Sequence, residues 1–210
     1  MSRQSAGGRK AQKGEYIETD TGNKVSRRAN ITGTANITLG GKTVIQADAY
    51  LRGDLQRRTD GADAKAPATA INVGRYTFIS QGCVIKPPSR ISRGQVSYYP
   101  LRIGDNVFIG PGSTVSAASI GSHVHIGENS ILQAGVIVKD CVKILPGSIV
   151  PANMVVPSFS VVGGQPARVV GELGEGWGVS PGGMSGGATT TSSGEWVEGG
   201  ELRELIRMTR

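Results

Sequence analysis

The sequence contains two histidines, and these are the first side chains whose spacing could serve catalysis. His123 and His125 are two positions apart. We expect them on opposite sides of a short strand, with at most one facing the core. A catalytic zinc site needs three protein ligands and an open position, which this pair cannot supply within one chain. A single histidine can act as a general base, but one beside turn residues is expected to be merely solvated.

Other reactive side chains are few. Cys83 and Cys141 form neither a CxxC motif nor a disulfide framework, which favours a reducing cytosol. An Arg-Gly-Asp triplet stands at Arg52–Asp54, but a cytosolic coil is expected to bury or pair these side chains rather than offer them to an integrin. No stretch approaches the ~18 apolar residues of a membrane span. Residues 1–14 are basic without an apolar run, so we predict a disordered arm and no secretory signal.

The elements that must position these residues recur every six positions. From residue 103 onward an aliphatic residue leads each unit, and nine of the ten steps between leaders are six residues long. The exception is the five-residue step from Val115 to Ile120, in the segment IGPGSTVSAASIG. The leaders are Ile103, Ile109, Val115, Ile120, Ile126, Leu132, Val138, Ile144, Val150, Val156 and Val162, with earlier units led by Val73, Ile79 and Ile85 and a looser series from Ile31 to Leu51.

A second position in each unit is also restricted. The fourth residue after the leader is small or β-branched in most units, and Gly, Asn, Asp or Pro stand between these positions. Two inward positions per six residues describe short strands separated by turns. Six residues are too few for the chain to reverse in every unit. The strands must therefore coil in one direction and stack in parallel, and the regular Gly and Pro exclude a buried helix.

This pattern resembles that of hexapeptide-repeat proteins. The resemblance implies an all-β fold, the left-handed parallel β-helix, in which three units form one triangular coil. The left-handed path is an exception to the usual crossover preference and is taken from the resemblance alone. Eighteen leaders give about six coils and a prism roughly 30 Å long at ~4.8 Å per coil. Both ends expose strand edges and need caps. The segment GGQPARVVGEL at 163–173 resembles the exit of such coils.

Two enzyme classes within this fold set the alternative to a non-catalytic protein. Hexapeptide-repeat acyltransferases use a histidine as general base, and γ-class carbonic anhydrases hold a zinc-type ion on three histidines. The triplet at Arg52–Asp54 resembles the one that precedes the metal ligands in the anhydrases. That resemblance places the ligand positions at Lys86, Pro111 and Ser116, none of which suits zinc. We predict a protein that is not an enzyme and has no metal or cofactor, with a carbonic-anhydrase-like or acyltransferase enzyme as the alternative.

Two insertions and a tail complete the organisation of the chain. The β-helix is predicted at 15–173, with a flexible charged loop at 55–70 and a second loop at 86–102. Residues 174–199 are predicted as a Gly/Ser-rich linker, and 200–210 as a short C-terminal α-helix. This helix is too short to be stable alone and should dock on the prism or on a partner. Its apolar face comprises Leu202, Leu205, Ile206 and Met208.

The chain is basic, with a formal net charge of +7. Nine Lys/Arg but three Asp/Glu lie from Arg52 to Arg102. Such an excess is typical of contact with acidic protein faces, anionic lipid or nucleic acid, or of a solvated surface. Regular base-stacking aromatics are absent from the second insertion, so lipid or nucleic-acid binding ranks last. Tyr and Arg are frequent anchors of protein contacts, and we predict partner binding by Lys86, Pro87, Pro88, Arg90, Arg93, Tyr98, Tyr99 and Pro100.

Several segments outside the generic repeat carry a more specific resemblance, which covers about residues 15–173. They are EYIETDTGNKVSRRANI at 15–31, LRGDL at 51–55, VIKPP at 84–88 followed by YYPLRIGDNVFI at 98–109, AASIGSHVHIGENSI at 117–131 and KDCVKILPGSIVPANMVVPSFSVVGGQPARVVGEL at 139–173. Together they resemble the family of the smaller β-helical subunit of the dynactin pointed-end complex. The chain departs from that family in its longer loop at 55–70, its basic arm at 1–14 and its linker at 174–199.

The resemblance implies a cytoplasmic, microtubule-associated scaffold of the cytoskeleton that works in dynein-driven transport. The partners it implies are a second β-helical pointed-end subunit, an actin-related pointed-end capping protein, a large zinc-bearing dynactin subunit and dynein cargo adaptors. It implies support for attachment to cargo such as early endosomes. It implies neither nucleic-acid binding nor direct insertion into a membrane.

Overall fold

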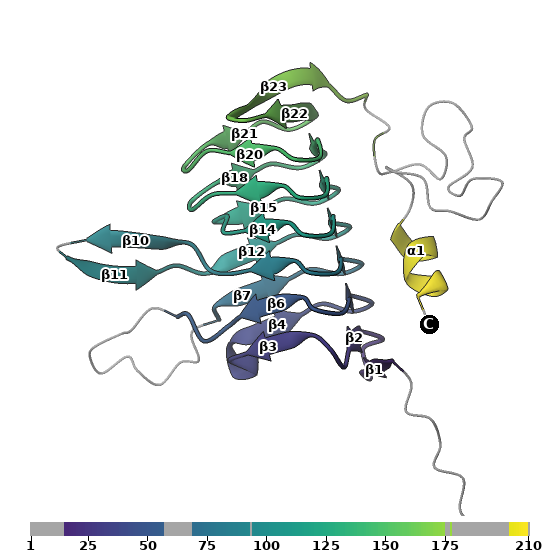
Figure 1. Cartoon of the computed structure of the whole chain (residues 1–210). Helices are drawn as coiled ribbons and strands as arrows, with labels where there is room; N and C mark the ends of the chain where they lie inside the picture. The colour runs from purple at the N-terminus through teal and green to yellow at the C-terminus, as the bar shows by residue number, and fades with distance from the viewer. Residues whose placement is uncertain (1–14, 57–68, 93, 175–176, 178–201, 210) are drawn as a thin grey trace, which may run out of the picture.

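The chain forms a three-sided β-helix in which parallel strands stack along one axis (Figure 1). The computed structural model describes residues 15–56, 69–92, 94–174, 177 and 202–209. The predicted arm at 1–14, most of the insertion at 55–70 and most of the linker at 174–199 lie outside the described residues. Within those residues the fold is nearly all-β, as the six-residue repeat predicted.

Three sheets form the sides of the prism, and we call them sheets A, B and C. Sheet A contains β1 (Tyr16–Glu18), β2 (Lys24–Ser26), β5 (Val44–Ile45), β8 (Phe78–Ile79), β13 (Phe108–Ile109), β16 (His125–Ile126), β19 (Lys143–Ile144), β22 (Ser160–Gly164) and β23 (Ala167–Glu172). Sheet B contains β3 (Asn30–Thr32), β6 (Tyr50–Arg52), β9 (Val84–Ile85), β14 (Thr114–Val115), β17 (Ile131–Leu132) and β20 (Ile149–Val150). Sheet C contains β4 (Ile37–Leu39), β7 (Ile71–Val73), β12 (Leu101–Ile103), β15 (Ser119–Ile120), β18 (Ile137–Val138) and β21 (Val155–Val156).

Each coil adds one strand to each sheet in the order A, B, C. Six complete coils run from β2 to β21 within the described residues, which matches the number predicted from the leaders. Three further elements lie outside this stack. They are the 3-10 turn η1 (Thr34–Asn36), the hairpin of β10 (Ser89–Ser92) and β11 (Gln95–Tyr98), and the helix α1 (Leu202–Met208).

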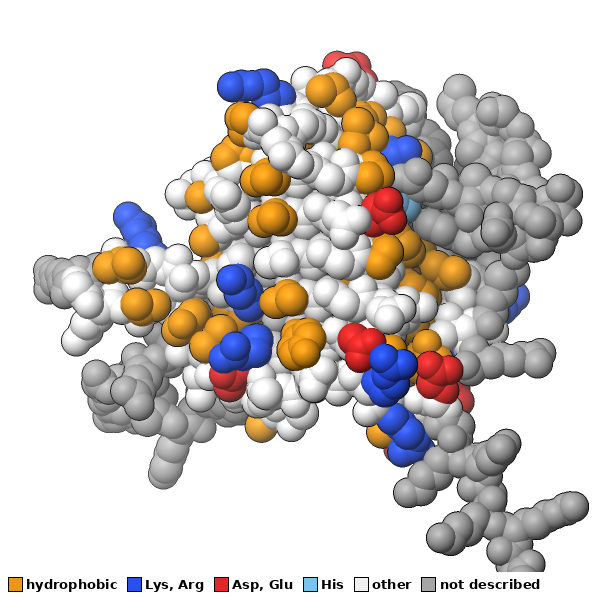
Figure 2. Space-filling model, viewed as in Figure 1, with side chains coloured by type: hydrophobic (Ala, Val, Ile, Leu, Met, Phe, Trp, Pro, Cys, Tyr) orange, Lys and Arg blue, Asp and Glu red, His pale blue; other side chains and the backbone are white. Residues whose placement is uncertain are grey.

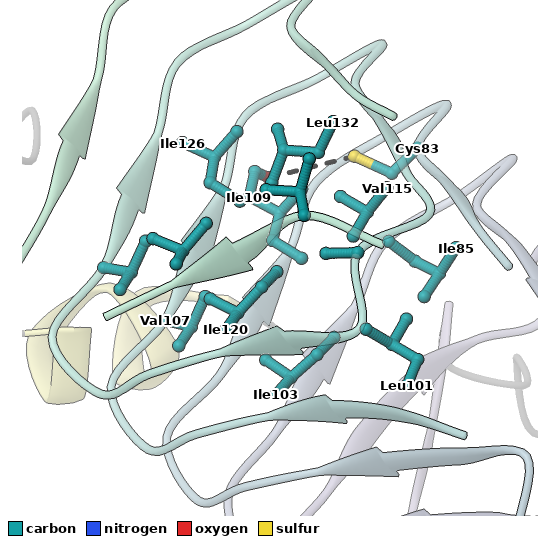
Figure 3. Packing of buried hydrophobic residues seen from close by; sticks show 14 of the residues in the cluster. Cys83, Ile85, Leu101, Ile103, Val107, Ile109, Val115, Ile120, Ile126 and Leu132 are labelled. Carbon is teal, nitrogen blue, oxygen red and sulfur yellow. Dashed lines mark hydrogen bonds between the residues drawn. The ribbon is translucent and has the colours of Figure 1, made fainter. Parts of the chain in front are cut away.

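The leading aliphatic residues form the core of the prism (Figure 3). Every leader from Ile103 to Val162 is 3% exposed or less. The leaders stack in register, so that Ile109 lies between Ile79 of the preceding coil and Ile126 of the next. Burying one such side chain stabilises the fold by ~1.5–3 kcal/mol. The stacked repeat therefore provides a continuous core without a bulky aromatic centre.

The second inward position is buried as well, and several units fill it with serine. The Ser113 hydroxyl donates to the Gly127 carbonyl oxygen at 2.9 Å, and the Ser148 hydroxyl donates to the Leu145 carbonyl oxygen at 2.6 Å. A buried hydroxyl without a partner costs about 1–3 kcal/mol. These bonds to the backbone remove that cost, and they explain how a polar residue fits a core position.

Both cysteines are free, as their sequence pattern predicted. Cys83 lies in the core, and its Sγ atom is 3.1 Å from the carbonyl oxygen of Gly110. Burial is the main cause that raises the pKa of the Cys83 thiol to about 11. Burial, followed by the nearby Asp140 carboxylate, also raises the pKa of Cys141. Both thiols therefore remain protonated near neutral pH.

The five-residue step falls at the corner between sheets B and C. Val115 still pairs with Leu132, and Ile120 still pairs with Val138, so the strands on either side keep their register. The shortened corner is closed by Ala118 and Ser119, whose amides donate to one carbonyl oxygen, that of Val136, at 2.8 and 3.4 Å. The missing residue is thus absorbed by a tighter corner.

Antiparallel strands close sheet A at both ends of the prism. β1 pairs with β2 at the N-terminal end, and β23 pairs with β22 at the C-terminal end. Both strands run against the parallel direction of the stack. The helix α1 lies against the outside of the prism, on the side away from the hairpin (Figure 1).

Candidate partner-binding surface

The insertion predicted as a loop at 86–102 is instead built around a β-hairpin that projects from the prism (Figure 1). β10 and β11 are antiparallel, with Ile91 opposite Val96 and Ser92 opposite Gln95. Gly94 lies in the connection and has a φ of 76°. Two-residue hairpin connections favour such a positive φ, which glycine adopts without a steric penalty.

The hairpin exposes aliphatic side chains that the described part of the chain leaves uncovered. Ile91 is 73% exposed and Val96 is 55% exposed. Neither residue belongs to the series of leaders, and the only signal in the sequence is the serine that follows each of them, Ser92 and Ser97. Hydrophobic and basic side chains lie together on the hairpin and at its base (Figure 2). Exposed apolar patches with polar surroundings mark interaction sites.

The structure divides the predicted contact residues into exposed and buried groups. Lys86, Arg90, Tyr99 and Pro100 are exposed, Tyr98 is half-buried, and Pro87 and Pro88 are buried. Arg93 lies outside the described residues. The two prolines are therefore packed at the base of the hairpin, while Lys86, Arg90 and Tyr99 remain accessible.

A groove runs between the hairpin and the prism. It has a volume of about 710 Å³. Its hairpin side includes Ile91 and Tyr99, and its prism side is lined by small residues at the corner between sheets B and C. Those small residues are Ala118, Ala134, Gly135 and Ala152. Because these side chains are small, they leave the groove deep enough for a side chain to enter it.

The positions that correspond to metal ligands in the anhydrases do not form a metal site here. Lys86 and Ser116 lie in successive coils and line one hollow of about 440 Å³ together with Tyr98 and Gln133. Pro111 lies in the turn between β13 and β14, which is a different corner of the coil. Lysine, proline and serine also lack the donor atoms that zinc favours. The residues present therefore do not fit the ion that the fold suggests.

The Arg-Gly-Asp triplet forms an internal ion pair. Arg52 donates from Nε and Nη2 to the two carboxylate oxygens of Asp54, each at 2.8 Å, and the Thr32 hydroxyl donates to Asp54 Oδ1 at 2.6 Å. These hydrogen bonds, with Arg52 first and Thr32 second, hold the pKa of Asp54 well below its usual range. The prediction that these side chains are paired is confirmed.

This arrangement predicts a pH-dependent effect of Asp54→Asn. The folded-state pKa of Asp54 is depressed, so its stabilisation is present above the unfolded-state pKa of ~3.9 and is lost as pH falls toward the folded value. Asp54→Asn should therefore lower the urea midpoint at pH 7, and the difference from the unaltered chain should shrink at pH 3. Arg52→Gln, which removes the same ion pair, should behave alike. A difference that is independent of pH would contradict the assignment.

The two histidines do not lie as the sequence predicted. Val124, which stands between them, takes the inward position and is 1% exposed. His125 points away from the core on sheet A, yet it is 6% exposed and stacks on Phe108 with ring centroids 4.6 Å apart. His123 lies in the preceding turn with a φ of 56°, and its Nδ1 atom is buried without a hydrogen-bond partner in the described part of the chain. The expectation of a solvated side chain is therefore wrong for His125, because the ring of Phe108 on the neighbouring strand of sheet A stacks on it.

The described residues lack two further features. Among the described residues there is no group of three or more His, Cys, Asp or Glu side chains placed to hold a metal ion. The same residues include no helix that is long and apolar enough to span a membrane.

The amino-acid sequence is similar to that of proteins of a known family. Residues 6–178 match the family model described as dynactin subunit 5. Dynactin subunit 5 of Dictyostelium discoideum is 42% identical over 111 residues, covering 53% of this chain and 50% of the relative. Gamma carbonic anhydrase 1, mitochondrial, of Arabidopsis thaliana is 29% identical over 113 residues, covering 54% of this chain and 40% of the relative. The chain thus spans half or less of the length of these two relatives.

Solved structures of low sequence identity share the fold. The N-acyltransferase AntD from Bacillus cereus, solved with dTDP and 3-hydroxybutyryl-CoA, has a TM-score of 0.56 at 14% identity and covers 72% of this chain and 80% of its own. A hexapeptide transferase family protein from Anaplasma phagocytophilum has a TM-score of 0.51 at 22% identity, with 73% and 80% covered. These likenesses establish the left-handed β-helix alone. The family match at residues 6–178 spans the whole β-helix, and the chain belongs to the dynactin subunit 5 family.

Proposed function

We propose that this protein is a non-catalytic structural subunit of the pointed-end complex of dynactin. In this role it supports attachment of dynein and dynactin to cargo such as early endosomes through protein–protein contacts. Its proposed partners are a second β-helical pointed-end subunit, an actin-related capping protein, a large zinc-bearing subunit and cargo adaptors. Family membership supports a place in the dynactin complex. On the same basis we propose a cytoplasmic, microtubule-associated location. The structural observation that carries the contact role is the uncovered hairpin β10–β11.

The residues at the anhydrase ligand positions support a non-catalytic role. Lys86 and Ser116 share one corner of the coil and Pro111 lies at another, so the three do not converge within one chain. Their donor atoms are also unsuited to zinc. A γ-carbonic-anhydrase-like or acyltransferase activity remains the alternative function. Stoichiometric zinc in the purified chain together with bicarbonate turnover would establish the first, and transfer of an acyl group to an acceptor would establish the second.

The hairpin has the composition of a contact surface. Ile91 and Val96 offer uncovered aliphatic area at its tip, while Tyr99 and Arg90 lie exposed nearby. Tyrosine and arginine are enriched among the residues that dominate binding energy at interfaces. The segment 86–102 contains no Asp or Glu, so charge complementarity favours an acidic face on the partner.

The test is co-purification of the complex with a double variant, Tyr98→Ala with Tyr99→Ala. We expect the recovery of the other pointed-end subunits and of cargo adaptors to fall at least tenfold, because anchor side chains of this kind contribute ~2 kcal/mol or more each. Tyr50→Ala is the matched control, since Tyr50 is 47% exposed on sheet B outside the hairpin. Unchanged recovery with the double variant would contradict the role of the hairpin. Failure of the unaltered chain to recover any dynactin subunit would contradict the function itself.

A further inference from the structure

The hollow of about 440 Å³ beside the base of the hairpin contains a column of polar side chains. Arg52 ends β6, and Lys86, Ser116 and Gln133 directly follow β9, β14 and β17. These four strands are neighbours in sheet B and pair in register. The four residues therefore stand one above another, about 4.8 Å apart. We call them the sheet B column, and all four line the hollow.

The column has an uncompensated positive charge. Arg52 and Lys86 lie on neighbouring strands, where like charges repel each other. Asp54 compensates Arg52, because its two carboxylate oxygens accept from Nε and Nη2 at 2.8 Å. Lys86 forms no ion pair with a described residue. Asp and Glu are absent from the described residues that line the hollow. One positive charge therefore faces the hollow without a counter-ion from the described part of the chain.

Two neutral donors of the column also lack partners. Ser116 is only 6% exposed, yet its hydroxyl makes no hydrogen bond to a described residue. Burying a hydroxyl without a partner costs stability. Gln133 accepts from the Ala152 amide through Oε1 at 3.0 Å, and this bond leaves its NH₂ group as the donor. That group has no partner among the described residues either. An acceptor in the hollow would supply both missing bonds and the missing negative charge.

The other walls of the hollow limit the kind of ligand. Leu55, Pro87 and Ile131 give it apolar surface. Small-molecule sites typically combine apolar walls with a few polar groups that fix the orientation of the ligand. A single uncompensated charge suits a monoanion, whereas a phosphate dianion would bring excess negative charge. The volume exceeds what a bare anion fills, so the ligand that fits has a carboxylate at one end and an apolar body at the other.

We propose that this hollow binds a small organic monocarboxylate. Its carboxylate accepts a charge-assisted hydrogen bond from Lys86 and further bonds from Ser116 and Gln133. Its apolar body packs against Leu55 and Ile131. The site consists of residues from the prism and the base of the hairpin, and it is distinct from the uncovered side chains at the hairpin tip. The proposal does not depend on the role in dynactin, because the ligand is bound by the chain itself.

The first experiment uses the full chain and benzoate as the probe, followed by saturation-transfer NMR at pH 7 and low salt. We expect saturable binding that weakens as salt is added, because salt screens exposed charges. Benzamide has the same shape without the charge, and acetate has the charge without the ring. Both should bind at least about tenfold more weakly than benzoate, since the carboxylate and the apolar body each contribute to binding. Absence of saturable benzoate binding overturns the proposal, and so does equal binding of benzamide or of acetate.

The second experiment locates the probe. Lys86→Met removes the charge and keeps an unbranched side chain, so it should weaken benzoate binding at least about tenfold. Ser116→Ala should weaken it several-fold. Lys139→Met is the matched control, because Lys139 is likewise an exposed lysine that directly follows a strand, β18 of sheet C. This control should bind benzoate as the unaltered chain does. Equal affinities of the Lys86→Met and Lys139→Met variants would place the probe elsewhere and overturn the proposal.

Discussion

Ile109→Ala is expected to lower the free energy of unfolding by about 2–5 kcal/mol. Ile109 is fully buried between Ile79 and Ile126. The lost methyl groups leave a cavity that adjacent coils cannot close, because their backbone hydrogen bonds fix the spacing and register. Urea unfolding followed by circular dichroism measures the change.

Ile131→Ala is the matched control for this prediction. Ile131 is the same residue type in an equally short strand, but it points outward from sheet B and is 40% exposed. Its replacement should change the free energy of unfolding by well under half as much, since little surface is removed from a packed environment. Comparable losses for both variants would contradict the inward and outward assignment of the repeat.

The second large effect is expected at Gly110, where two coils approach closely. A Cβ atom at this position would lie 2.6 Å from the Glu128 nitrogen and 2.7 Å from the Gly127 carbonyl carbon. Both are backbone atoms of the next coil, so no side chain can swing aside. Gly110→Ala should therefore force the coils apart locally and lower the free energy of unfolding by about 1–3 kcal/mol.

The same urea titration tests this prediction against Gly174→Ala. A Cβ atom at Gly174 meets no other atom within 4 Å in the described part of the chain. That variant should stay within ~0.5 kcal/mol of the unaltered chain. Equal free energies of unfolding for the two variants would contradict the close stacking of the coils at Gly110.

The architecture was predictable because one regularity determines it. A leader every six residues fixes which side chains point inward, and the parallel stack follows from the lack of room for reversals. The five-residue step from Val115 was visible in the sequence, and so was the unsuitability of Lys86 and Pro111 as metal ligands. In each of these cases the inference depends only on residue type and on spacing along the sequence.

Two of the features that the sequence did not predict, the burial of His125 and the docking site of α1, depend on contacts between distant segments, whereas the hairpin was missed because its strands are short. The hairpin strands are four residues each, which is too short for an alternating pattern to stand out from a loop. His125 is buried because Phe108 of the previous coil stacks on it. The docking site of α1 likewise combines Lys24 and Phe78 with a helix far along the chain. These contacts join outward-facing residues that occupy matching register positions in different coils. The six-residue repeat identifies only the inward-facing residues, so it does not predict them.

The antiparallel strands at the two ends of sheet A also limit the length of any assembly made by stacking this chain end to end. β3 and β4 are edge strands of sheets B and C at one end, and β20 and β21 are edge strands at the other. Open edges template further pairing. A second prism placed end-on would meet parallel-compatible edges on two sides and a reversed strand, β1 or β23, on the third. A parallel stack cannot continue through sheet A at either end, so β1 and β23 disfavour end-to-end growth of this prism into a fibre.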